Sequence, residues 1–126
     1  MRIFQNRTFE QFARRNRIPI AAICNAAQEL SAGLIHANLG GGVYKQRIAR
    51  RGEGKSGGFR SIIFFRAEHR TFFFLGFAKN MKANLAPKEL ADLKEYAKEL
   101  LNYDDQQIKL ALSNGAFIEI FCPEAI

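Results

Sequence analysis

The central third of the sequence concentrates positively charged side chains. Residues 43–82 carry ten lysines and arginines against two acidic residues, Glu53 and Glu68, so this segment has a charge of +8 in a protein of net charge +7. Charge of one sign repels itself unless a polyanionic partner neutralises it, and nucleic acid is the commonest such partner. The composition therefore favours a protein that binds nucleic acid through its phosphates.

The strand pattern of this segment predicts where part of the charge meets. Residues 43–48, 59–65 and 71–77 are rich in Phe, Ile and Val and indicate three strands, two of them long. In a meander, the end of the first strand, the start of the second and the end of the third lie at one edge of the sheet. The cations expected at that edge are Arg47, Arg50, Arg51, Lys55, Arg60 and Lys79. Arg60 is the most informative because it interrupts an apolar strand; its alternative role is an ion pair with the acidic third helix.

Other kinds of site find little support in the sequence. Gly-Lys-Ser at 54–56 imitates the end of a phosphate-binding P-loop, but Ala49 stands where that motif requires glycine, and a strand rather than a helix follows. His36 and His69 are too distant to pair, and neither has a cysteine or carboxylate at ligand spacing. We therefore expect no metal and no cofactor, and any chemistry on phosphate would depend on cations.

The flanking sequence predicts the elements that position these cations. Pro19 begins a helix with apolar residues at helical spacing, and the glycines at 40–42 are expected to end it. The predicted elements are a short strand at 2–5, helices from Thr8 and Pro19, the three strands, a helix from Pro87, a short helix at 105–112 and a strand at 116–121. Thr8 and Gln11 fit a helix N-cap pair. This order indicates an α+β fold: an N-terminal αα-hairpin packed on a twisted antiparallel sheet, with an additional C-terminal helix and strand.

Length and composition predict one domain over residues 1–126. No apolar run reaches the roughly 20 residues that span a bilayer, and the N-terminus lacks a signal-peptide pattern, so we expect a cytoplasmic protein without a membrane partner. Cys24 and Cys122 lie far apart in apolar contexts, which predicts two buried free thiols.

Three pieces of the sequence resemble a known family. They are Lys-Ser-Gly-Gly-Phe-Arg at 55–60, Gly-Phe-Ala-Lys-Asn at 76–80 and the amphipathic helix at 86–101. The chain is similar over residues 3–120 to the RelE/ParE superfamily of type II toxins, in particular to its phage- and plasmid-associated RelE-like (Gp49-like) branch. The resemblance implies a microbial-RNase-like fold with two N-terminal helices on a twisted antiparallel sheet.

The resemblance also implies an activity and the residues that perform it. RelE-type members are ribosome-dependent mRNA endonucleases that occupy the ribosomal A site, where a ribose 2′-OH attacks the neighbouring phosphate. The positions that match the family's catalytic cations are Lys45, Arg47, Arg60 and Lys79. Arg60 would stabilise the phosphate, and Lys79 would neutralise the leaving 5′-oxygen or the same phosphate. Lys45 would act as the general base, because neighbouring cations lower the pKa of a lysine. Flanking RNA would be held by Arg50, Arg51 and Lys55, with a base stacked on Phe77.

One departure from the family pattern keeps a second function open. Some RelE-type nucleases carry a tyrosine or histidine near the C-terminal end, whereas this chain has only Tyr96 and Tyr103 after Lys79, both in helical sequence. ParE-type relatives share the fold without nuclease activity and poison DNA gyrase, so the alternative is a non-enzymatic toxin of gyrase or another protein. Either version implies a cognate antitoxin, which we expect to be joined to a helix-turn-helix DNA-binding domain.

Overall fold

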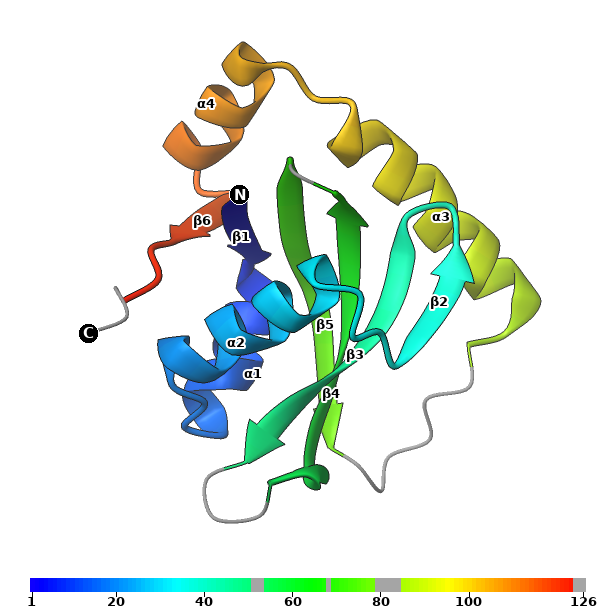
Figure 1. Ribbon diagram of the computed structural model, residues 1–126. Coiled ribbons are helices and arrows are strands. Elements are labelled where there is room, and N and C mark those ends of the chain that lie inside the picture. The colour runs from blue at the N-terminus through cyan, green and yellow to red at the C-terminus, as the bar shows by residue number, and fades with distance from the viewer. Residues whose placement is uncertain (51–53, 68, 79–84, 124–126) are drawn as a thin grey trace.

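The computed structural model describes residues 1–50, 54–67, 69–78 and 85–123, and it shows an α+β fold in which helices cover both faces of one six-stranded sheet (Figure 1). The elements are β1 (Arg2–Asn6), α1 (Arg7–Arg15), α2 (Ile20–Ser31), β2 (Ala37–Gly40), β3 (Val43–Arg50), β4 (Gly54–Arg66), β5 (Arg70–Ala78), α3 (Pro87–Leu101), α4 (Asp105–Ser113) and β6 (Phe117–Ile120). The predicted fold class is confirmed.

The strands are arranged in the order β2-β3-β4-β5-β1-β6. The antiparallel meander of β3, β4 and β5 is the predicted one. The sheet is mixed, because β1 lies between β5 and β6 and pairs parallel with β5, whereas its pairing with β6 is antiparallel. The first strand of the chain thus occupies an interior position in the sheet and is paired on both sides.

The N-terminal half differs from the sequence prediction at three points. Asn6 rather than Thr8 caps α1, since its side chain accepts a hydrogen bond of 2.8 Å from the Phe9 N–H. Helix α2 ends at Ser31, and the residues after it form β2, a strand that was not predicted. The glycines at 40–42 all have positive φ, so they form the tight turn between β2 and β3 and do not end the helix.

The C-terminal helices begin where capping chemistry favours a helix. Pro87 occupies the first turn of α3, as predicted, and the Glu89 carboxylate accepts a hydrogen bond of 3.1 Å from the Ala86 N–H. Asp104 and Gln107 form a reciprocal capping box at the start of α4. These two helices cover the face of the sheet opposite α1 and α2.

The core consists of one apolar cluster on each face of the sheet. On the α1 and α2 face, Phe9 and Leu30 are buried with strand residues that include Ile63. On the other face, α3 and α4 pack on Phe64 and Phe72. Strands β4 and β5 contribute to both clusters, which explains why their apolar runs hardly alternate, and this confirms them as central strands.

The two cysteines form a disulfide bond, so the prediction of two free thiols was wrong. Cys24 lies in α2 and Cys122 follows β6; they are 98 residues apart in sequence, with a Cα–Cα distance of 5.8 Å. This separation of Cα atoms is typical of disulfides. The sheet topology brings the two residues together, because the end of β6 lies beside α2. Sequence spacing alone contains no sign of this contact.

Among the helices that the structure describes, none has the length and apolar composition to cross a membrane.

Candidate nucleic-acid interface

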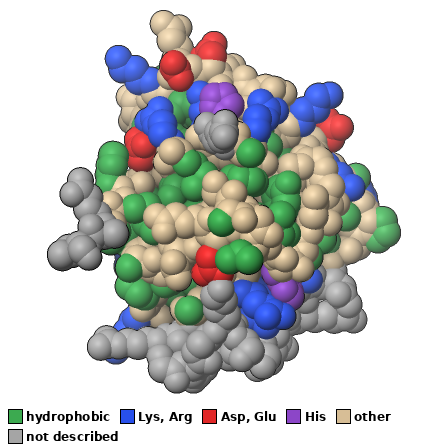
Figure 2. All heavy atoms as spheres, viewed as in Figure 1, with side chains coloured by type: hydrophobic (Ala, Val, Ile, Leu, Met, Phe, Trp, Pro, Cys, Tyr) green, Lys and Arg blue, Asp and Glu red, His purple; other side chains and the backbone are tan. Residues whose placement is uncertain are grey.

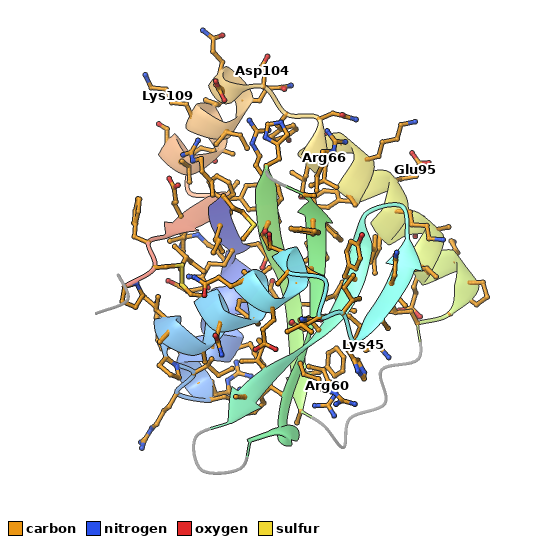
Figure 3. The ribbon with its side chains drawn as sticks, viewed as in Figure 1. Lys45, Arg60, Arg66, Glu95, Asp104 and Lys109 are labelled. Carbon is orange, nitrogen blue, oxygen red and sulfur yellow. A yellow bond between two sulfur atoms is a disulfide. The ribbon has the colours of Figure 1, made fainter. Side chains whose placement is uncertain are left out.

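Strand register places the predicted cations in one row across the sheet. Arg47 of β3 lies opposite Arg60 of β4, and Arg60 lies opposite Phe77 of β5. Lys45 is two residues before Arg47 on β3, so it lies on the same face of the sheet. We call Lys45, Arg47, Arg60 and Phe77 the basic row. In Figure 3, Lys45 and Arg60 lie close together at the end of the sheet opposite Arg66.

The basic row shares a sheet face with α3 but lies beyond the part that the helix covers. Ile62, opposite Lys45, is buried in the cluster beneath α3, and Leu75, the next residue across the sheet, packs against the same cluster. Phe77 is half-buried, whereas Arg47 is exposed. The apolar cluster therefore supports one side of the row, where Lys45 and Arg60 are partly buried and Arg47 is exposed.

The arrangement holds two positive charges side by side. The pKa of Arg60 is lowered, first because the guanidinium is partly buried and second because Arg47 repels its charge. A guanidinium remains protonated at physiological pH despite such a shift. Like charges directly opposite on neighbouring strands destabilise a sheet, and an anion bound between them relieves the repulsion.

A histidine outside the predicted site, His36, belongs to the same region. His36 is exposed and lies directly before β2, and its backbone N–H donates a 3.0 Å hydrogen bond to the Gln46 side chain. The pKa of His36 is lowered from its ordinary value of 6.5, chiefly because its ring loses hydration at the edge of the sheet. Repulsion by Arg47, Arg60 and Lys45 lowers the same pKa further. In Figure 2, the histidine side chains visible on this face lie beside Lys and Arg side chains.

An open cleft of about 420 Å³ borders the basic row at the edge of the sheet, where α2 ends. His36 and Arg47 both line it, as do Glu29 of α2 and the buried Gln46 of β3. Leu34, which is 62% exposed, adds apolar surface. The cleft thus combines a cation, an imidazole and an apolar contact surface.

The structure does not describe the side chains of the remaining predicted site residues. Arg51 and Lys79 lie outside the described residues. Arg50 and Lys55 belong to β3 and β4, but their side chains are not among the parts described.

The arginines at the other end of the sheet have structural contacts. Arg66 donates a 3.0 Å hydrogen bond to the Leu101 carbonyl at the end of α3. Arg70 is 6% exposed, donates to the Tyr103 carbonyl and pairs with Asp105 at 3.2 Å. These cations fasten the two C-terminal helices to the β4–β5 hairpin and lie apart from the basic row.

The tyrosines that follow Lys79 in sequence are also engaged elsewhere. The Tyr96 ring on α3 packs against Phe74 at 5.3 Å between ring centroids, and burial is the main reason why the pKa of Tyr96 is raised. Tyr103 lies between α3 and α4, where its carbonyl accepts the hydrogen bond from Arg70. In the described part of the chain, no three His, Cys, Asp or Glu side chains come together in a group suited to a metal ion.

The fold and the basic row define an α+β protein with a cationic face at one end of a mixed sheet. Residues 1–120 match the family model described as RelE toxin of RelE / RelB toxin-antitoxin system, and the chain belongs to this family. No curated protein matches the chain. Membership makes the protein a type II toxin and implies an antitoxin partner.

Proposed function

We propose that this toxin is a ribosome-dependent mRNA endonuclease that stops translation. The observation that carries the proposal is the register of three adjacent strands, which aligns Arg47, Arg60 and Phe77. Neighbouring strands are about 4.8 Å apart, so the row spans about 10 Å, enough for one phosphate and the base beside it.

The proposed reaction is metal-independent attack of a 2′-OH on the adjacent phosphate. Arg60 and Arg47 bind the scissile phosphate and stabilise the negative charge that develops on it. Lys45, on the same face, adds a third positive charge, and the half-buried ring of Phe77 offers a surface on which a base can stack. Cations fixed on strands cost little reorganisation during the reaction, which makes this kind of stabilisation effective.

Four further cations, whose side chains the structure does not describe, have roles in the proposed reaction. We assign Lys79 to the leaving 5′-oxygen, and Arg50, Arg51 and Lys55 to phosphates of flanking mRNA or ribosomal RNA. We expect these contacts to carry no base specificity, because phosphates are the same at every position. The antitoxin partner, which we expect to be joined to a helix-turn-helix DNA-binding domain, would cover the basic row with an acidic segment.

The test is controlled expression in cells of the wild type, Arg60→Ala and Arg14→Ala, with mapping of transcript ends. Arg14 is a suitable control because its side chain is 74% exposed and forms a surface ion pair with Glu10, a kind of contact that contributes little to stability. We expect cuts inside translated frames that disappear when translation is blocked. Loss of Arg60 should reduce cleavage by about 100-fold to 1,000-fold, as for other fixed transition-state donors. The control variant should cleave like the wild type.

The positions of the two tyrosines favour one alternative, a toxin of the ParE type that inhibits DNA gyrase or another protein. Tyr96 lies on α3 and packs against Phe74, and Tyr103 lies between α3 and α4. Neither tyrosine lies beside the basic row. Growth arrest with intact transcripts would contradict the nuclease proposal and support this alternative.

A further inference from the structure

The cleft at the edge of the sheet brings a titratable side chain next to the proposed phosphate-binding cations. His36 and Arg47 line the same cleft. Arg47 of β3 also lies opposite Arg60 of β4, and it is the one of the two arginines nearer to the edge of the sheet. A ribose held at this cleft would therefore adjoin a phosphate bound by the two arginines.

A buried glutamine fixes the backbone that carries His36. The Gln46 amide donates a 2.8 Å hydrogen bond to the Leu34 carbonyl and accepts one of 3.0 Å from the His36 N–H. Gln46 is 3% exposed, and its backbone carbonyl accepts a bond of 3.1 Å from the Ser61 hydroxyl in β4. The segment before β2 is thus tied to the strand that carries Arg47, and this limits its movement relative to the basic row.

We infer that His36 is the general base that removes the proton from the attacking 2′-OH, in place of Lys45. This inference rests on the proposed nuclease function and deepens it. The apolar surface of Leu34, which lines the same cleft, gives the ribose or its base a contact that does not compete for the proton.

The proposed step transfers one proton to His36 and exchanges one bond from phosphorus to oxygen for another. A neutral ring nitrogen of His36 takes the 2′-OH proton as the bond between the 2′-oxygen and phosphorus forms. The bond from phosphorus to the 5′-oxygen breaks, and the leaving oxygen takes a proton from water. The products are a 2′,3′-cyclic phosphate and a 5′-hydroxyl, and the imidazolium returns its proton to solvent.

The charges around the cleft favour the neutral imidazole that this role requires. Arg47 and Lys45 of β3 and Arg60 of β4 all disfavour protonation of His36, in addition to its loss of hydration. Glu29 of α2 also lines the cleft and is the acidic group on that side. The pKa of His36 lies below 6.5, so the base is unprotonated near neutral pH.

The experiment is single-turnover cleavage of a defined mRNA on purified ribosomes, measured from pH 5 to 8. We compare the wild type, His36→Gln, His36→Ala and His69→Gln. His69 is the matched control because it is exposed and lies at the β4–β5 turn, at the opposite end of the sheet. Binding to ribosomes that carry the same mRNA with a 2′-deoxy group at the cut site separates affinity from chemistry.

We expect His36→Gln to slow cleavage by about 100-fold or more, the usual contribution of a positioned base, with binding to the 2′-deoxy complex unchanged. The wild-type rate should fall about tenfold per pH unit below the pKa of His36, and the variant should lose this dependence. Added imidazole should restore part of the rate of His36→Ala, and His69→Gln should match the wild type.

Three results would overturn the inference. A His36→Gln rate within threefold of the wild type, with the same pH dependence, would exclude His36 as the base while leaving the nuclease function intact. A rate loss fully explained by weaker binding of the 2′-deoxy complex would make His36 a contact residue only. A wild type that cleaves no mRNA would remove the proposed function itself.

Discussion

Replacing Gly76 by alanine tests how α1 is packed beneath the basic row. A Cβ atom on Gly76 would lie 2.3 Å from Cδ2 and 2.5 Å from Cε2 of the Phe12 ring, far inside van der Waals contact. Phe12 in turn packs edge-to-face on Phe59, with 5.5 Å between centroids, and Phe59 directly precedes Arg60. The added methyl group must therefore displace the ring and its neighbours.

The cost can be estimated from this geometry. Inserting a methyl group into a packed core usually costs about 1–3 kcal/mol, and replacing glycine in a strand returns about 0.5–1 kcal/mol because alanine restricts the unfolded chain. A contact as short as 2.3 Å places this insertion in the upper part of the cost range, so the expected net loss in the free energy of unfolding is about 1–2 kcal/mol. At an unfolding entropy of about 2.1 cal/mol/K per residue, a chain of 126 residues should show a fall in Tm of about 4–8 °C.

Thermal unfolding followed by circular dichroism measures this shift in a double-mutant cycle. We compare the wild type, Gly76→Ala, Phe12→Ala and the double variant. Removing the ring abolishes the clash, so the double variant should lose less stability than the two single changes together, with a coupling of about 1 kcal/mol. A Tm for Gly76→Ala within 1 °C of the wild type, or strictly additive effects, would refute the described packing of Phe12 on Gly76.

Two further predictions concern the disulfide and the acid dependence of stability. Reduction, or Cys24→Ser, removes a cross-link across 98 residues and should lower the free energy of unfolding by about 2–4 kcal/mol; equal urea midpoints with and without reductant would contradict this. Arg2 lowers the pKa of Glu119 from its ordinary value of 4.5, chiefly through their hydrogen bond. The pair therefore stabilises the folded protein fully above the ordinary pKa of Glu119. This stabilisation is lost as the pH falls through the lower pKa that Glu119 has in the folded protein. Glu119→Gln should make the urea midpoint fall less steeply on acidification, and an unchanged slope would count against the pairing.

Local patterns predicted much of the fold and the centre of the candidate site. The β3–β5 meander follows from short connections and apolar runs, and the prediction that Arg47 and Arg60 meet at one edge follows from the meander. The starts of α3 and α4 follow from Pro87 and from side chains that satisfy free backbone N–H groups. Each of these features depends on residues near one another in sequence.

A short strand and the contacts between residues far apart in sequence escaped prediction. Strand β2 is only four residues long and pairs with β3 through backbone groups, which require no particular side chains. Its sequence therefore resembles the end of a helix followed by a loop. Without β2, the sequence predicts that His36 lies within a helix, away from Arg47. The parallel pairing of β1 and the bond between Cys24 and Cys122 depend on the complete topology, which no local pattern specifies.

The interior position of β1 has a consequence for the order in which the chain folds. This strand is synthesised before the other strands of the sheet, yet Ile3 pairs with Thr71 on one side and with Ile120 on the other. The β3–β5 meander needs only short loop closures and can form early, whereas both partners of β1 require long ones, which are slower. We therefore expect the basic row to assemble while the sheet is still open at β1. Strand β6, the last of the described strands in chain order, would then complete the pairing of β1.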